Sequence, residues 1–464
     1  MKDNTYKTFL LTLLVIVLLM LLHFLPSFSI FGMSLRKINI LSQLITFPGD
    51  NETIDVIPKP KDPKQILARS KNGKLLEFKE IWPKGTQPIL DYSEGNSGGM
   101  DHFYAMVDSA SKHKLKGRPV RIAYYGDSFI EADILVADLR EMLQSKYGGN
   151  GVGWIDAGND LEQYKRSIKA TFSGLTEHMV MKSESYNPAL AGIAERYYTM
   201  NGSASLLLEG TKEYPHASVW DNSRLYFRSN GNVSVSGKID KKAWLSETYN
   251  SSPSLRTFDE HGRTSSVRYK FKGSPVLFGA ALESDGGLIV DNFSMRGSKG
   301  NTLANLPDRT LQEFHDQRPY DLIILQFGVN AVDAKSSDKD MHDYLAQMKE
   351  VIKKFRRCFP DASILVVSTP DRGSKEGGAT MPNIKALEGY QKELAAEEKV
   401  AFYSLFHAMG GDGSMARLHD KGMSSADYVH VSHGGGKLIA RQVFNSLVAG
   451  ENNYLRRRKL ENEL

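Results

Sequence analysis

A serine, a histidine and an aspartate in this chain have the types and the context expected of a nucleophilic catalytic centre. Ser128 lies in the tripeptide Gly126-Asp127-Ser128, directly after the apolar run that begins at Ile122. A serine hydroxyl is a weak nucleophile at neutral pH and needs a neighbouring base. His430 can accept its proton, and Asp427, three residues earlier, can hold the other imidazole nitrogen. The expected chemistry is therefore attack of Ser128 on an ester.

Such an attack also requires hydrogen-bond donors for the negative charge that develops on the carbonyl oxygen. The candidates are the backbone N–H groups of Ser128 and Gly297 and the side-chain amide of Asn330, because each residue follows an apolar strand. The carboxyl ends of neighbouring parallel strands meet at one edge of a sheet, where ligands bind. Two of these residues have structural interpretations as well: Gly297 could be a turn glycine, and Asn330 could cap a helix.

A parallel α/β sheet is the element that would bring these residues together. Apolar strands with helical connections are predicted at 121–126, 288–290, 321–326, 363–367 and 400–403. Five such strands favour a flavodoxin-like, doubly wound parallel sheet in the order 2-1-3-4-5. An amphipathic segment follows Ser128 at once, so we expect the serine near a helix N-terminus, where free N–H groups favour negative charge.

The composition changes along the chain and predicts an inserted domain. Between about 160 and 284, short alternating runs are separated by Gly, Ser and Asn, which favours an all-β sandwich. Val267, Tyr269 and Phe271 form its clearest apolar face. The expected parts are a transmembrane segment (1–34), a connector (35–95), the first part of the α/β domain (96–159), the inserted β-sandwich (160–284), the second α/β part (285–450) and a polar tail (451–464).

The N-terminal residues predict export from the cytoplasm. Residues 9–25 form an apolar run that reaches about the minimum length for a membrane-spanning helix. Lys2 and Lys7 precede this run, and no clear small-residue cleavage site follows it. A signal-anchor that holds the protein in the membrane is therefore favoured over a cleaved signal peptide. Both interpretations place the catalytic part outside the cytoplasm, in the periplasm of the cell envelope.

Composition argues against several other functions. The net charge is only +5, and no basic run is interleaved with aromatic residues, so we expect no nucleic-acid partner. The single cysteine, Cys358, excludes an intrachain disulfide and a CxxC metal site. His407 and His419 lack the partner spacing of metal ligands. No metal and no organic cofactor is expected.

Three side chains are candidates for substrate binding, and each has a structural alternative. Trp220 and Trp244 in the predicted β-sandwich can stack on sugar rings or pack in its core. Arg372 can bind substrate near the cleft or form a structural ion pair. His433 could compete with His430 as the base, but the three glycines that follow it predict a loop residue.

The order of four short motifs resembles that of the SGNH (GDSL-type) hydrolases. The motifs are Gly126-Asp127-Ser128, Asn292–Gly297, Gly328–Asn330 and Asp427–His430. The resemblance implies a flavodoxin-like fold, a Ser128–His430–Asp427 triad and an oxyanion hole formed by Ser128, Gly297 and Asn330. Two positions depart from the family pattern: Ser294 often corresponds to a glycine, and Ala331 to an aspartate.

Residues from about 100 to 450 resemble, more narrowly, bacterial peptidoglycan O-acetylesterases with a carbohydrate-binding-like β-sandwich insert. The supporting stretches are Ile122–Ser128, Asp138–Gln144, Pro370–Arg372 and Met409–Met415. Phe129 is a departure, since these esterases often have a histidine there. The resemblance implies hydrolysis of O-acetyl groups on peptidoglycan. The alternatives are an esterase or acetyltransferase acting on another polysaccharide, and an inactive glycan-binding wall protein.

Overall fold

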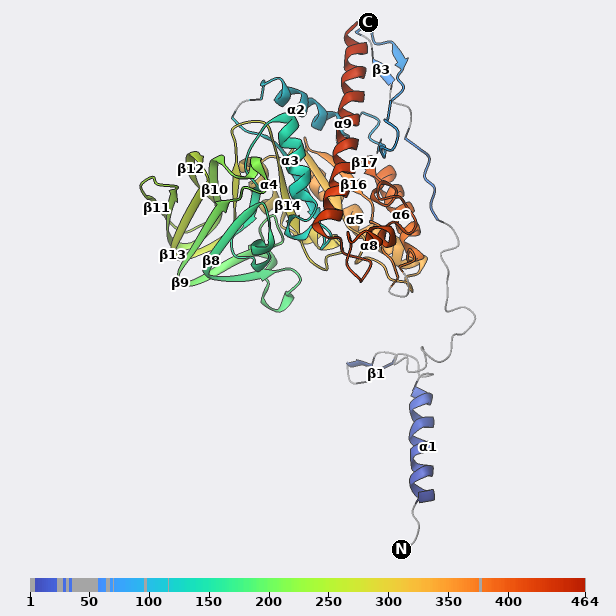
Figure 1. The fold of residues 1–464 in the computed structure, drawn as a ribbon. Helices are drawn as coiled ribbons and strands as arrows, with labels where there is room; N and C mark the ends of the chain where they lie inside the picture. Colours follow the sequence, from blue (N-terminus) through green and yellow to red (C-terminus); the bar gives the residue numbers. More distant parts are fainter. Residues whose placement is uncertain are drawn as a thin grey trace. The chain divides into compact units, whose positions relative to one another are not determined.

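The computed structural model of the chain (Figure 1) describes residues 5–22, 28–30, 33–35, 57–63, 67–69, 71–95, 98–115, 117–374 and 378–463. It divides into two compact units, Met1–Asp55 and Val56–Leu464. The first unit holds helix α1 (Thr5–Leu22) and a hairpin of β1 (Phe28–Ile30) and β2 (Met33–Leu35). Among the helices that the structure describes, none is long and apolar enough to span a membrane, so the spanning helix predicted for 1–34 is not found.

The larger unit contains the predicted parallel sheet. Its strand order is β14-β6-β15-β16-β17-β5, and the first five strands run parallel. In chain order these five are numbered 2-1-3-4-5, which confirms the flavodoxin-like arrangement. The bounds are β14 (Leu288–Ser294), β6 (Val120–Gly126), β15 (Leu322–Gln326), β16 (Ser363–Val367), β17 (Ala401–Tyr403) and β5 (Ile89–Asp91).

Strand β5 is a correction, because it lies in the predicted connector and adds a sixth, antiparallel strand beside β17. Three residues are too few to show an alternating pattern, so this strand has no sequence signal and is defined only by its pairing. The connector also holds a hairpin of β3 (Leu67–Arg69) and β4 (Leu75–Glu77).

Helices cover both faces of the sheet, which is why its strands are apolar throughout. On one face, Ile122 and Tyr124 belong to a buried cluster with residues of three helices. On the other, the ring of Tyr125 lies 5.1 Å from that of Phe355. The helices of the first face are α2 (Asp101–Ser111), α3 (Val136–Tyr147) and α9 (His433–Glu463), and α5 (Asp338–Cys358) covers the second, flanked by α4 (Asp308–Gln317) and α6 (Asn383–Glu397).

The final helix corrects the prediction of a polar tail at 451–464. Helix α9 continues through it to Glu463, and Glu451, Asn453 and Arg457 are buried. Their polar atoms have partners that sequence alone does not reveal. The Asn453 carbonyl accepts a 2.8 Å hydrogen bond from the Ile81 backbone, and Arg457 forms an ion pair with Asp101. The charged residues of this segment are therefore partly anchored on the domain.

The strand pairing of the β domain does not confirm the predicted sandwich. Its strands are β7 (Gly153–Asp156), β8 (Ile168–Met179), β9 (Arg196–Gly210), β10 (Trp220–Ile239), β11 (Leu245–Tyr249), β12 (Ser252–Thr264) and β13 (Ser266–Glu283). They pair into one seven-stranded antiparallel sheet, so a sandwich of two sheets is not confirmed. Long strands explain this: β10 pairs first with β12 and then with β11, and β13 pairs with β9 and then β7.

The predicted apolar face of the β domain is present. Val267, Tyr269 and Phe271 are buried in one cluster with Leu206 and Val235. The remaining short elements are η1 (Glu131–Asp133), η2 (Asp160–Tyr164), η3 (Ser183–Ser185), η4 (Pro188–Leu190), η5 (Pro215–Ala217), η6 (Asn301–Asn305), α7 (Leu405–Ala408) and α8 (Ser414–Asp420).

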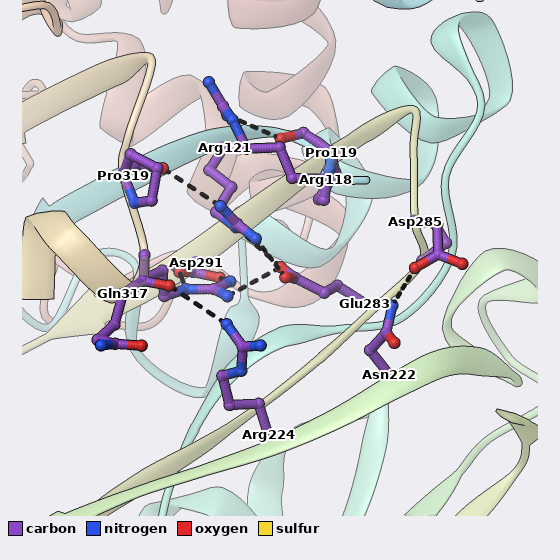
Figure 2. A network of polar contacts seen from close by, with 12 residues as sticks. Arg118, Pro119, Arg121, Asn222, Arg224, Glu283, Asp285, Asp291, Gln317 and Pro319 are labelled. Carbon is purple, nitrogen blue, oxygen red and sulfur yellow. Dashed lines mark hydrogen bonds and ion pairs between the residues drawn. The ribbon is translucent and has the colours of Figure 1, made fainter. Parts of the chain in front are cut away.

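A buried network of charges joins the β domain to the parallel sheet at the end opposite Ser128 (Figure 2). Glu283 of β13 accepts a 2.6 Å hydrogen bond from Arg121 of β6 and lies 2.8 Å from Arg318. Arg318 also donates to Asp291 of β14 at 2.7 Å. Burial raises the pKa of Glu283, but Arg121 and Arg318 outweigh it and hold that pKa at about 2. Both domains therefore share one ionised, hydrogen-bonded junction.

Candidate active site

Ser128 lies in a tight turn at the carboxyl end of β6. Gly126 is needed there, because a Cβ on it would lie 2.9 Å from the Ile130 side chain and 3.0 Å from the Gln326 carbonyl oxygen. The Asp127 carboxylate accepts a 2.9 Å hydrogen bond from the Phe129 N–H, as expected for a structural turn residue. The turn therefore presents the intervening Ser128 side chain outward.

The helix predicted directly after Ser128 begins later than expected. The short element η1 intervenes, with Ala132 and Asp133 at φ values of 52° and 62°, and α3 starts only at Val136. Left-handed backbone at two successive residues breaks the chain direction. Ser128 is therefore not in the first turn of a long helix, and the expected contribution of a helix dipole does not apply.

His430 and Asp427 meet Ser128 from the loop between α8 and α9. The Ser128 Oγ lies 2.9 Å from His430 Nε2, and His430 Nδ1 lies 2.7 Å from Asp427 Oδ2. These are the contacts that a serine nucleophile, a base and an orienting carboxylate require. The three residues span 302 positions of sequence, and the fold brings them together.

The carboxylate of Asp427 is held ionised by its surroundings. Its Oδ1 accepts hydrogen bonds from the backbone N–H groups of Val429 (2.9 Å) and His430 (3.1 Å) and from the Ser425 hydroxyl (3.0 Å). Partial burial raises the pKa of Asp427, but the hydrogen bonds from His430 and these N–H groups outweigh it and hold the pKa well below its ordinary value. An ionised Asp427 accepts a hydrogen bond from the Nδ1–H group of His430, which leaves Nε2 free to accept the Ser128 proton.

The two further oxyanion candidates follow the strands on either side of β6. Gly297 follows β14, and Asn330 follows β15. The Asn330 side-chain amide donates a 3.1 Å hydrogen bond to the Ser298 carbonyl, so it links the two loops and keeps one N–H for other partners. Gly297 has a φ of 77°, which explains a glycine on conformational grounds as well. Asn330 precedes no helix directly, so the capping interpretation is not supported.

An open groove of about 920 Å³ adjoins these two residues. Gly297 and Asn330 both line it, together with charged and amide side chains from the N-terminal half of α5. Ser128 and His430 are not among the residues that line it. Among the described residues, no group of three or more His, Cys, Asp or Glu side chains is placed to hold a metal ion.

Arg372 lines the same groove but is engaged by the protein. Its guanidinium donates hydrogen bonds to the backbone carbonyls of Val329 (2.5 Å) and Val332 (3.3 Å). It therefore fixes the loop that carries Asn330, rather than forming the structural ion pair that was the alternative to substrate binding. Contact with a substrate stays a prediction.

The two tryptophans differ in their environments. Trp220 has no exposed surface, and its indole N–H donates to the Ser223 hydroxyl at 2.6 Å. It is a core residue and cannot stack on a sugar, which corrects its assignment as a candidate binding residue. Trp244 is 40% exposed, and the Lys270 ammonium lies 4.5 Å from its ring centroid. Binding of substrate by Trp244 stays a prediction.

His433 is a second correction. It is not in a loop but begins helix α9, and its Nδ1 is buried without a hydrogen-bond partner. Burial, followed by the nearby Arg166, lowers its pKa. His430, not His433, forms the hydrogen bond with Ser128. His407 bonds Glu388, and His419 packs against the Tyr428 ring, so both have structural partners.

Two side-chain contacts near Ser128 were not predicted. Asn292 donates 2.8 Å hydrogen bonds to the Ile130 carbonyl and to Asp133, which connects β14 to the turn after Ser128. Arg296, next to Gly297, forms an ion pair with the buried Glu131. The sequence indicated only that Asn292 is a polar residue inside the second motif. The structure shows which residues it bonds.

Comparison with known proteins agrees with this geometry. Residues 261–438 match the GDSL-like Lipase/Acylhydrolase family. The match contains Gly297, Asn330, Asp427 and His430, and begins well after Ser128 because the β domain separates the first motif from the others. No curated protein sequence matches the chain.

The fold is similar to that of a solved structure described as "Peptidoglycan O-acetylesterase in action, 5 min". The two share 18% identity with a TM-score of 0.65, over 78% of this chain and 99% of that one. A family 2 carbohydrate esterase with a carbohydrate-binding domain from Corynascus thermopiles (Myceliophthora fergusii) shares 10% identity with a TM-score of 0.27, over 59% of this chain and 98% of that one. The family match over residues 261–438, together with the fold, supports a carboxylic ester hydrolase.

Proposed function

We propose that this protein removes O-acetyl groups from a bacterial cell-wall polysaccharide, with O-acetylated peptidoglycan as its substrate. The observation that carries the proposal is the continuous set of hydrogen bonds from Ser128 through His430 to Asp427. The overall similarity to a structure described as a peptidoglycan O-acetylesterase supports the choice of ester.

In the proposed reaction, Ser128 Oγ attacks the acetyl carbonyl carbon while His430 Nε2 takes the hydroxyl proton. The carbonyl oxygen becomes an oxyanion, which the backbone N–H groups of Ser128 and Gly297 and the Asn330 amide stabilise. The intermediate then expels the sugar oxygen, which takes the proton from His430. Water attacks the acetyl-Ser128 ester with His430 again as base, and acetate leaves. Asp427 stays ionised and stabilises the imidazolium in both steps.

Two features support a hydrophilic substrate and water as the acceptor. The groove beside Gly297 and Asn330 is lined by charged and amide groups, whereas a long acyl chain requires an apolar pocket. The side chains of His430 and Asp427 are 47% and 41% exposed, so water reaches them readily. Solvent access favours hydrolysis over transfer of the acetyl group to a second sugar.

The test is acetate release from O-acetylated peptidoglycan, acetyl xylan and acetylated alginate, by the wild type and by Ser128→Ala. We expect release from peptidoglycan by the wild type alone. Release of acetate from acetyl xylan or acetylated alginate alone would show that the substrate is that polymer and not peptidoglycan. Acetyl transfer to an added glycan would identify an acetyltransferase. Failure of the wild type to turn over even p-nitrophenyl acetate would support an inactive glycan-binding wall protein.

We also propose that the apolar N-terminal run at residues 9–25 directs export, because peptidoglycan lies outside the cytoplasm. Cell fractionation of the full chain and of a chain without residues 1–34 tests this. We expect the full chain in the envelope fraction and the shortened chain in the cytoplasm.

A further inference from the structure

The groove beside the candidate oxyanion residues has no net charge. Three cationic side chains, Lys299, Lys335 and Arg372, and three anionic ones, Asp333, Asp340 and Asp343, line it. A strongly anionic or cationic polymer would gain little from such a balanced surface. The lining therefore fits an uncharged ligand with many hydroxyl or amide groups, such as the sugar backbone of a glycan.

Several of these charged groups are already engaged within the protein. Asp340 is part of the capping box of α5, and Asp343 forms a 2.5 Å ion pair with Lys339. Two uncharged side chains of the groove are bonded to each other: the Asn301 amino group donates a 2.5 Å hydrogen bond to Gln347 Oε1. This contact orients both amides, and within the described part of the chain it leaves the Asn301 carbonyl and the Gln347 amino group available to a ligand. An acceptor and a donor held side by side suit the hydroxyl and acetamido groups of a sugar.

One residue of the β domain, Met181, lies close to Gly297 but does not line the groove. A Cβ built on Gly297 would lie 3.5 Å from the Met181 Cε, so the Met181 side chain lies close to Gly297. Met181 belongs to the connection between β8 and β9 and is 44% exposed. An exposed thioether beside the proposed oxyanion site can pack on the C–H face of a sugar ring.

The connection that carries Met181 is anchored on the second motif. Arg196, at the start of β9, donates a 2.9 Å hydrogen bond to the Ser294 carbonyl and pairs with Asp156 at 2.9 Å. The Tyr125 hydroxyl of β6 donates to the Ile193 carbonyl at 3.3 Å. Because Arg196, Tyr125 and Ile193 are buried, these contacts anchor the end of the connection that leads into β9.

We propose that Asn301 and Gln347 in the groove, and Met181 from the β domain, bind the sugar units that flank the acetylated one. The inference rests on the proposed esterase function and extends it: the substrate is a polymer, and the β domain takes part in binding it at the active site. The acetyl group itself reacts at Ser128 and needs none of these three side chains.

The test compares Gln347→Ala and Met181→Ala on O-acetylated peptidoglycan and on p-nitrophenyl acetate. Losing one hydrogen bond or the apolar contact of one methionine side chain weakens a binding constant by about fivefold to tenfold. We expect kcat/KM on the polymer to fall by that factor through KM, with p-nitrophenyl acetate turnover unchanged. Matched controls are Glu350→Ala, exposed on the same helix, and Leu245→Ala, 41% exposed in the β domain. Both should leave the two substrates unaffected.

A second measurement removes turnover altogether. Cosedimentation of Ser128→Ala with insoluble peptidoglycan reports binding alone, and adding Gln347→Ala or Met181→Ala to it should weaken that binding by the same factor. Unchanged polymer kinetics and binding in both variants would overturn the inference and leave the esterase intact. An equal loss on the polymer and on p-nitrophenyl acetate would also overturn it, because it would assign these residues to the reaction centre. Loss of all activity in Ser128→Ala tests the proposed function separately.

Discussion

Replacing Asp427 by asparagine tests the proposed reaction most directly. The asparagine carbonyl can keep the hydrogen bonds that Asp427 Oδ1 accepts from the Val429 and His430 N–H groups. Its amino group then occupies the place of Oδ2, 2.7 Å from His430 Nδ1. Because an amino group donates, Nδ1 must become the acceptor, and the proton moves to Nε2. In that tautomer His430 cannot take the proton of Ser128.

The size of the effect follows from this tautomer change. In a buried triad the same substitution lowers kcat by about 10⁴. The Asp427 side chain is 41% exposed, so water can partly replace its interaction with His430. We therefore expect kcat to fall by about 10²–10⁴, which corresponds to about 3–5 kcal/mol in the activation barrier.

The assay is the initial rate of p-nitrophenyl acetate hydrolysis at saturating substrate, with thermal unfolding measured in parallel. Asp420→Asn, on an exposed residue of the preceding helix, is the matched control and should retain full activity. If Asp427→Asn keeps its kcat within fivefold of the wild type and remains folded, Asp427 does not orient the base, and the proposed triad is wrong.

Three further predictions concern single residues near the site and in the β domain. Asn330→Ala should lower kcat by about 10²–10³ with little change in p-nitrophenyl acetate KM, as expected for a lost oxyanion donor; a change confined to KM would contradict this. Trp220→Ala should reduce the free energy of unfolding by about 3–5 kcal/mol in urea titrations, whereas exposed Trp244→Ala should cost less than about 1 kcal/mol. Burial raises the pKa of Asp127 to about 7, despite the Phe129 N–H bond that lowers it, so ionising Asp127 opposes folding between about pH 4 and 7. The melting temperature of Asp127→Asn should therefore rise relative to that of the wild type as pH increases through that window. A difference in melting temperature that does not change with pH would refute the raised pKa of Asp127.

The sequence determined the parts of this protein that depend on local patterns. Apolar runs such as 321–326 favour strands covered on both faces, and their succession with amphipathic helices indicated the 2-1-3-4-5 order that the structure has. The residues at the ends of those runs, Ser128 and Asn330, follow from the same pattern. His430 and Asp427 could be chosen because a serine nucleophile requires a base with a carboxylate at a suitable spacing.

Only the tertiary structure decided features that depend on partners distant in the chain. Strand β5 exists because β17 offers it a free edge, and α9 extends through a charged segment because Ile81 and Asp101 satisfy its polar groups. Trp220 is a core residue for the same reason. An aromatic side chain has one sequence signature whether it is buried or exposed, and packing against other strands makes the difference. Met181 and Gly297 lie in different parts of the chain, so no local pattern could have predicted that the Met181 side chain lies close to Gly297.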